Sequence, residues 1–282
     1  MFVLCLFLVI LYMVVVLGVI LPYWYEAGNS SCADIPAVKW SFGPVVKLWL
    51  VAAWSALLLG VAGVADPILR LIGNKNEGGG NDELPPVLLL HGLYHNPSGW
   101  MFFRRHLRKA GFRKIQAMGY SSRNMTIEAL TEKVDATVRE LESRYPGQKP
   151  ILVGHSLGGL ITRNWLADEE NQRRILCAVT LGTPHLGSKM AAMAFGKLGR
   201  SLIPTNPFFA NLARREAPAS IPCISLVAEA DAMVLPQENL VPVTAGWKMR
   251  LTPYTTHTGM LSDGAVLRMV IWELHKIIAR KE

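Results

Sequence analysis

Cysteine is scarce in this sequence, with four in 282 residues. No two cysteines form a C-x-x-C pair, and none lies near histidines at the spacing of a zinc site. We therefore expect free structural cysteines, a compartment that is not oxidising, and no metal site. Motifs for a nucleotide or a flavin are missing as well, so we expect no cofactor.

Basic residues are missing from the start of the chain, where Lys39 is the first of 29 lysines and arginines. Because a secretory signal peptide begins with a basic segment, this absence favours a retained anchor over a cleaved signal. The whole chain has a net charge of +8, and the part from Pro67 onward, with 27 basic and 18 acidic residues, carries +9, which suits an anionic lipid surface. Since no basic stripe with interleaved aromatic residues is present, we expect no nucleic-acid partner.

The first 72 residues are instead rich in apolar sequence. Residues 2–21 form an uncharged apolar run about long enough to cross a bilayer core, and the aromatic residues after Pro22 fit a membrane interface. Residues 48–65 form a shorter, Ala-rich run, which is either a second span or a buried or interfacial helix. We therefore expect residues 1–72 to be a membrane anchor with one or two transmembrane helices.

The distribution of basic residues predicts an orientation for this anchor. Lysines and arginines are commoner after the second apolar run than between the two runs. The positive-inside rule then places the rest of the chain in the cytoplasm. The expected location is the inner membrane of a bacterium.

The rest of the chain follows a linker. Residues 73–86 are rich in Gly and Asn and end in two prolines, which predicts a flexible connection. Residues 87–282 alternate between strand and helix patterns, which predicts an α/β domain with a mostly parallel sheet and helices on both faces. The expected strands are 87–91, 114–118, 150–154, 177–181, 222–228 and 247–251, and the expected helices are 100–110, 126–144, 156–167 and 262–279.

The sharpest motif is G-x-S-x-G, which spans Gly154 to Gly158 around Ser156. A buried strand leads into it and a helix follows, as a nucleophile elbow requires. The turn is tight, so small residues flank the serine and leave its hydroxyl exposed above the sheet. We therefore predict Ser156 as a nucleophile.

A serine hydroxyl needs a base, and His257 is the best candidate among seven histidines. It lies in a Thr/Gly-rich loop between the last expected strand and the last helix. The other candidates fit less well, because they lie upstream of the motif, inside it, on helices, or before any suitable acid: His91, His95, His106, His155, His185 and His275.

The base in turn needs a carboxylate, which holds the imidazole in one tautomer. The chain order Ser, acid, His restricts the acid to residues between the nucleophile and the base. Asp231 follows the strand 222–228 and is favoured, with Glu229 as the alternative. The backbone N–H groups of Leu157, after the nucleophile, and Leu93, after His91-Gly92, are the expected oxyanion donors.

At these residues the sequence resembles α/β-hydrolase lipases and esterases, especially bacterial triacylglycerol lipases. The resemblance covers roughly residues 85–280. It implies the α/β-hydrolase fold, with a Ser156–Asp231–His257 triad and oxyanion donors at Leu93 and Leu157. The matching segments are LLLHGL, VGHSLGG, TLGTPHLGS, DAMVLP and HTGML.

Residues 189–221 form an insertion that we expect to be a lid over the site. Met190, Met193, Ala194 and Leu198 fall near one helical face, which suits an apolar acyl chain, although an ordinary packing helix is the alternative. The expected function is hydrolysis of lipid-like or other apolar esters at a membrane, with membrane lipid as a partner. Acyl transfer on the same triad and a non-catalytic membrane scaffold are the alternatives.

Overall fold

The computed structural model describes residues 2–29, 34–35, 46, 49–54, 57, 60–61 and 83–280. Most of the expected linker, 73–86, and much of the second apolar run, 48–65, lie outside the described residues.

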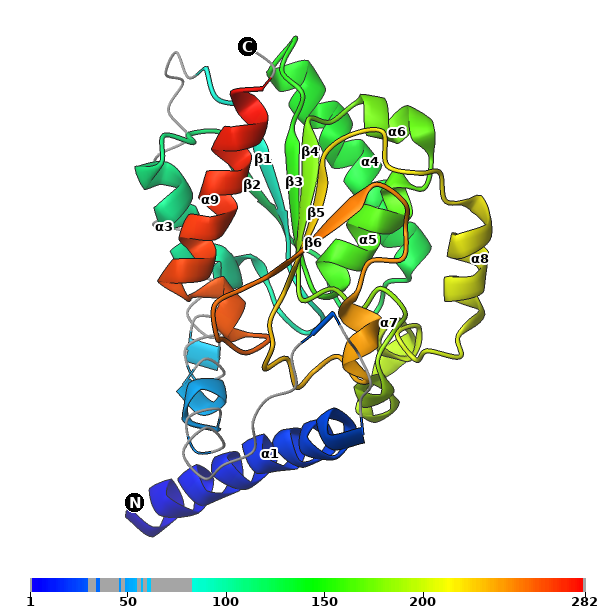
Figure 1. Ribbon diagram of the computed structural model, residues 1–282. Coiled ribbons are helices and arrows are strands. Elements are labelled where there is room, and N and C mark those ends of the chain that lie inside the picture. The colour runs from blue at the N-terminus through cyan, green and yellow to red at the C-terminus, as the bar shows by residue number, and fades with distance from the viewer. Residues whose placement is uncertain are drawn as a thin grey trace.

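The centre of the molecule is a six-stranded sheet in which every pairing is parallel. Its spatial order is β2-β1-β3-β4-β5-β6 (Figure 1). The chain therefore places β2 on one side of β1, returns to place β3 on the other side, and then adds β4, β5 and β6 in succession. The six segments expected to be strands form this sheet. The four central strands are buried along their whole length, as strands covered on both faces must be, whereas the two edge strands carry polar residues that are partly or fully exposed. The strands are β1 (Val87–Leu90), β2 (Ile115–Met118), β3 (Ile151–His155), β4 (Cys177–Leu181), β5 (Cys223–Val227) and β6 (Trp247–Leu251).

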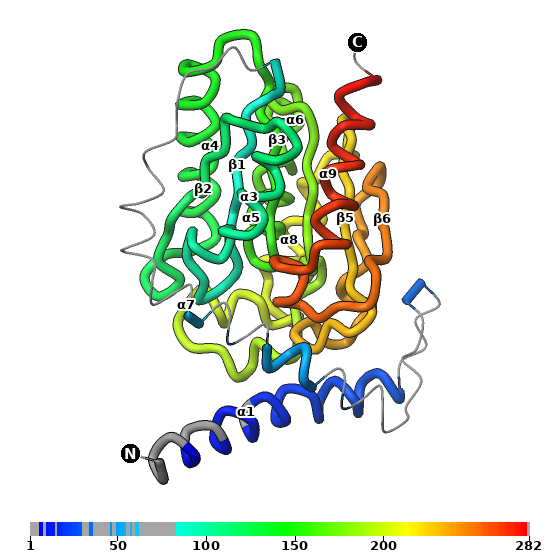
Figure 2. Tube along the Cα trace, turned by 90° about the vertical axis from the view of Figure 1, so that its left-hand side faces the viewer, coloured from blue at the N-terminus to red at the C-terminus, as the bar shows by residue number. Residues whose placement is uncertain are grey.

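Helices cover both faces of this sheet (Figures 1 and 2). On one face, α3 (Met101–Lys109) and α9 (Gly264–Ile278) enclose a core with Trp100, Phe103 and Phe112. On the other face, α4 (Ile127–Arg144) and α5 (Leu157–Leu166) enclose a second apolar core. The expected α/β architecture is therefore confirmed.

The helix starts follow from local chemistry. Thr126 caps α4, because its Oγ1 accepts a hydrogen bond from the Ala129 backbone N–H at 3.3 Å. Asp263 caps α9 in the same way, since its Oδ1 accepts from Ala265 N–H at 2.8 Å. Such side chains satisfy amide groups that have no partner within the first helical turn.

The insertion at 189–221 differs from the expected single helical face. It holds three short helices, the 3-10 helix η3 (Lys189–Met193), α7 (Gly196–Arg200) and α8 (Pro207–Arg215). The extended Ala194 and the positive φ of Gly196 (+81°) interrupt the helical path. Consequently Met190 and Leu198 are buried while Met193 is exposed, so the expected common face is wrong. A further short helix that was not expected, α6 (Glu169–Arg173), precedes β4.

The first apolar run forms α1 (Phe2–Asn29), which continues past the expected end at Leu21. Pro22 lies within it, and the turns beyond it pack on the rest of the protein through Tyr23 and Ala27. Among the described residues, α1 is the helix long and apolar enough to cross a membrane by length and composition, over Ile10–Asn29. It lies across one end of the molecule (Figure 1).

Candidate active site

The parallel sheet brings the expected site residues together, because the carboxyl ends of its strands share one edge. Ser156 directly follows β3, and Asp231 follows β5. His257 lies between β6 and α9, and Leu93 lies in the loop after β1. Segments far apart in the sequence thus meet at one end of the sheet.

The backbone at Ser156 forms a sharp turn. Its φ of +54° and ψ of −119° are rare for a residue other than glycine. The flanking residues Gly154 and Gly158 have no room for a side chain. A β-carbon on Gly154 would lie 2.5 Å from Gly159 N, and one on Gly158 would lie 2.1 Å from Leu90 O. The strained turn has the form expected of a nucleophile elbow.

His257 and Asp231 form a buried pair. The distance between His257 Nδ1 and Asp231 Oδ2 is 2.7 Å, and the Asp231 side chain is fully buried. Asp231 Oδ1 accepts from the backbone N–H groups of Met233 at 2.9 Å and Val234 at 3.0 Å, which fixes the carboxylate. Because a carboxylate accepts, Nδ1 carries the proton and Nε2 is left as the acceptor.

The alternative acid, Glu229, has a different position. Its backbone carbonyl accepts hydrogen bonds from Tyr23 Oη at 2.9 Å and from Gln237 Nε2 at 2.8 Å. Of the two candidates, the fold brings Asp231 to the base.

His155, inside the G-x-S-x-G motif, is hydrogen-bonded to the loop that carries His257. Its Nε2 donates to the backbone carbonyl of His257 over 3.0 Å, and the two rings lie 4.8 Å apart. Burial lowers the pKa of His155 well below its usual value, so the ring is neutral. His95 stacks on it at 5.8 Å, and burial lowers the pKa of His95 to about 4. Two neutral histidines therefore adjoin the proposed base.

The two expected oxyanion donors both lie near the serine, Leu157 as its neighbour in the chain and Leu93 in the lining of the same cavity. Leu157 is the first residue of α5, whose opening N–H groups have no partner within the helix. Leu93 lines the same cavity as Ser156. Its loop is held by Tyr120 Oη, which donates to the His91 carbonyl, and by Ser122 Oγ, which accepts from Tyr94 N–H at 2.9 Å.

An apolar cavity of about 220 Å³ opens beside Ser156 and His257. Much of its apolar wall comes from the insertion and from the loop after Asp231, and α1 contributes Val19. The apolar lining residues are Val19, Leu93, Pro184, Met190, Ala191, Met193, Ala194, Leu202, Met233 and Val234. Such a lining excludes water and accommodates a hydrocarbon chain.

Comparison with known proteins identifies the fold. Residues 85–218 match the sequence profile of the alpha/beta hydrolase fold. The chain has the α/β-hydrolase fold. It resembles the lipases and esterases that share this fold: over 95 residues it is 30% identical to Triacylglycerol lipase 2 of Saccharomyces cerevisiae. That match covers 33% of this chain and 29% of the yeast protein, so the chain spans less than a third of its relative.

Solved α/β hydrolases have a similar backbone. The mature Bacillus licheniformis lipase BlEst2 matches with a TM-score of 0.59 and 18% identity, over 70% of this chain and 94% of that one. A monoacylglycerol lipase of Paleococcus ferrophilus matches with a TM-score of 0.54 and 20% identity, over 68% of this chain and 96% of that one. At these identities the likeness shows the fold.

Some residues that hold this α/β-hydrolase site were not singled out from the sequence. Ser188 Oγ donates to Met233 O at 2.7 Å and accepts from Leu235 N–H at 3.0 Å, which ties the insertion to the acid loop. Arg163 Nη1 donates to His185 O at 2.5 Å, and its guanidinium pairs with the buried Glu216. The GTPHLGS segment, which contains His185 and Ser188, is the sequence feature that could have pointed to these contacts.

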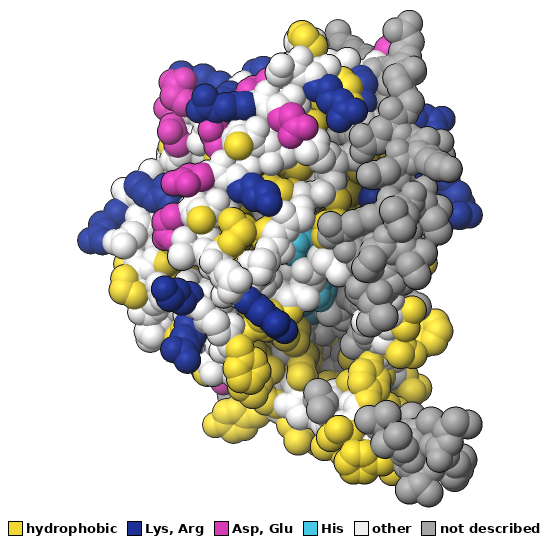
Figure 3. All heavy atoms as spheres, turned by 180° about the vertical axis from the view of Figure 1, so that it is seen from behind, with side chains coloured by type: hydrophobic (Ala, Val, Ile, Leu, Met, Phe, Trp, Pro, Cys, Tyr) yellow, Lys and Arg dark blue, Asp and Glu magenta, His cyan; other side chains and the backbone are white. Residues whose placement is uncertain are grey.

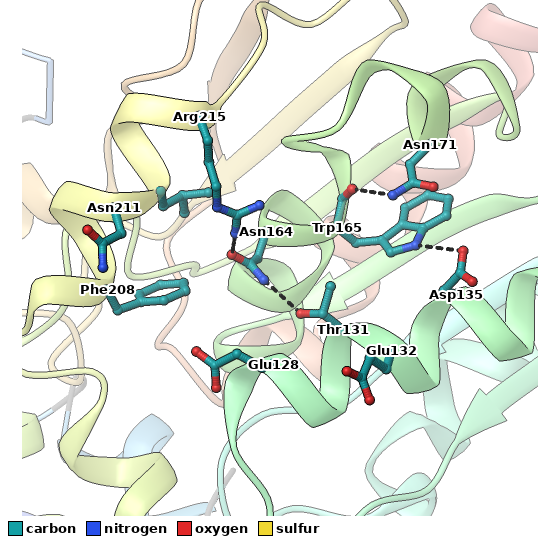
Figure 4. A pocket seen from close by; sticks show the side chains of 11 residues that line it. Glu128, Thr131, Glu132, Asp135, Asn164, Trp165, Asn171, Phe208, Asn211 and Arg215 are labelled. Atoms are coloured by element: carbon teal, nitrogen blue, oxygen red, sulfur yellow. Dashed lines mark hydrogen bonds between the residues drawn. The ribbon is translucent and has the colours of Figure 1, made fainter.

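A second cavity, of about 540 Å³, lies between α4, α5 and α8 (Figure 4). Its polar groups bond one another: Asn164 Nδ2 donates to Thr131 Oγ1 at 2.7 Å, and Arg215 bonds to Asn164 Oδ1. Its described lining has no serine, cysteine or histidine, so it lacks the residue types of a serine or cysteine nucleophile with a histidine base.

Proposed function

We propose that this protein is a membrane-anchored serine hydrolase that cleaves carboxylic esters of lipid-like substrates through an acyl-enzyme on Ser156. The observation that carries the proposal is the buried Asp231–His257 pair, 2.7 Å apart, at the cavity that also holds the strained Ser156. A base with a fixed tautomer that lines the same cavity as a serine is an arrangement that suits nucleophilic catalysis.

The proposed reaction proceeds in two halves. Ser156 Oγ attacks the ester carbonyl while His257 Nε2 takes the hydroxyl proton, and Asp231 stabilises the imidazolium that forms. The negative charge on the carbonyl oxygen is met by the backbone N–H groups of Leu93 and Leu157. As the C–O bond breaks, the imidazolium returns the proton to the leaving alkoxide, and the acyl group stays on Ser156.

Water completes the cycle. His257 takes a proton from a water molecule as its oxygen attacks the acyl carbonyl. The second tetrahedral intermediate then collapses, the proton passes to Ser156 Oγ, and a free carboxylic acid leaves. No step requires a metal or an organic cofactor.

Two features support a lipid-like substrate and a membrane location. The cavity wall is largely apolar, and α1 exposes a row of large apolar side chains. Seen from behind, hydrophobic side chains gather at the end of the molecule where α1 lies (Figure 3). Exposed apolar surface of this kind favours contact with lipid. In this proposal residues 1–72 act as the anchor, 73–86 as the linker and 87–282 as the catalytic domain. By the positive-inside rule this domain faces the cytoplasm of a bacterial cell.

The test is labelling of membranes by a fluorophosphonate probe, which reacts with an activated serine. Wild type and Ser201→Ala, whose hydroxyl donates to the Lys197 carbonyl, should label equally. Ser156→Ala and His257→Ala should not label, and Ser156→Ala should release no fatty acid from an acylglycerol. Undiminished labelling or hydrolysis in Ser156→Ala would overturn the proposal. Acylation of an added alcohol, without free acid, would identify an acyltransferase instead.

A further inference from the structure

The helix α1 has no polar face, yet one side of it is docked on the catalytic domain. Four side chains at spacings of three and four residues are buried, namely Val16, Ile20, Tyr23 and Ala27. This is the repeat of a single helical face. They pack against η3 through Met190 and against the acid loop through Ala230, Ala232 and Leu235. Because α1 is apolar on every side, its composition does not determine which face packs. The contacts with the catalytic domain determine it.

Two polar contacts fix the rotation and the register of the docked half. Tyr23 Oη donates to the backbone carbonyl of Glu229 at 2.9 Å. Lys189 Nζ lies 2.8 Å from Glu26 Oε1. The first contact holds the loop that carries Asp231, and the second holds the start of the insertion. Both segments line the cavity, so α1 is joined to two of its walls.

The fixed register places Val19 on the wall of the cavity that contains Ser156 and His257. Val19 adjoins the buried face of α1, and it is half-buried itself. Met190 and Met233 line the same cavity. At about 220 Å³ the cavity is smaller than most ligand pockets, so a change in the volume of one lining side chain alters much of the space available.

We infer that α1 is a specificity element as well as an anchor, and that Val19 limits the acyl chain that fits beside Ser156. The inference rests on the proposed ester hydrolysis. A larger side chain at this position fills space that the distal part of a long acyl chain occupies. A smaller one opens that space, while the ester group at Ser156 is unaffected.

The experiment uses the full chain in detergent micelles and compares kcat/KM for p-nitrophenyl butyrate and laurate. Val19→Trp should lower the laurate-to-butyrate ratio by about tenfold or more, because lost space for methylene groups costs about that much. Val19→Ala should raise the ratio. The matched control is Val14→Trp, on the outer face of α1 with 57% of the side chain exposed, which should leave the ratio unchanged.

Fluorophosphonate labelling of each variant reports whether its site is intact. If Val19→Trp labels like wild type and keeps the wild-type ratio, the inference is overturned while the proposed function stands. An equal shift in Val14→Trp would also overturn it, since the effect would then come from the membrane-facing side. If wild type hydrolyses neither ester and does not label, the proposed function fails and takes the inference with it.

Discussion

Replacement of Asp231 by asparagine tests the proposed triad through the tautomer of its base. Asp231 Oδ2 faces His257 Nδ1, and Asp231 Oδ1 accepts two backbone N–H bonds, from Met233 and Val234. Asparagine has nearly the same shape but carries one acceptor oxygen and one donor NH₂ group. The surrounding donors decide which way the amide turns.

One orientation keeps the amide oxygen on the two backbone N–H groups. The other turns the NH₂ group toward them, which leaves two buried donors unsatisfied at about 1–3 kcal/mol each. The first orientation is therefore favoured, and it directs the NH₂ group of residue 231 at His257 Nδ1. That nitrogen must then accept, so the proton moves to Nε2, which can no longer accept the Ser156 proton.

The expected loss follows from this tautomer. An enzyme with the wrong tautomer of its base keeps its geometry but loses about four orders of magnitude in kcat. This factor corresponds to about 5 kcal/mol of transition-state stabilisation. The effect on KM should be small, because the cavity wall that holds the acyl chain is unchanged.

The assay is hydrolysis of a p-nitrophenyl ester under saturating substrate, with Glu229→Gln as the matched control. Glu229 lies two residues from Asp231 and offers its backbone carbonyl to its partners, so the control should retain wild-type kcat. The reasoning is refuted if Asp231→Asn stays within about tenfold of wild type, a loss far below that of a wrong tautomer. A large loss in Glu229→Gln alone would assign the role to the other acid.

Two further predictions concern packing around the site. Gly182→Ala should lower kcat about 100-fold, because its methyl group would lie 3.0 Å from atoms of both the acid and the base, and small displacements there are costly. Gly147→Ala has a comparable positive φ with open space around it, so urea unfolding should show a stability loss of about 1–2 kcal/mol while kcat is unchanged. Arg163→Met should destabilise the protein by about 3–5 kcal/mol in urea unfolding, since it leaves the buried Glu216 carboxylate unpaired. Arg173→Met, which breaks an exposed pair, should leave the unfolding midpoint unchanged.

Local pattern was sufficient for much of this fold. The apolar runs at β1, β3, β4 and β5 are buried on both faces, so their composition alone predicts central strands. The turn at Ser156 is local in part: Gly154 is required by the backbone of Gly158 and Gly159 within the elbow, whereas Gly158 is required by Leu90 of the neighbouring strand. The order of strands and helices then predicts that the residues after β3, β5 and β6 share one edge.

Tertiary contacts decided what local pattern left open. Asp231 and Glu229 lie two residues apart on one loop, and the direction of that loop, held by Ser188 and by two N–H bonds to Asp231, selects which one meets His257. The insertion has helical composition but is broken at Ala194, where φ and ψ are extended. The docked face of α1 is the clearest case. A helix that is apolar on every side has no periodic pattern that would identify its packed face. The contacts with the catalytic domain therefore determine which side of α1 packs, and they place Val19 at the cavity.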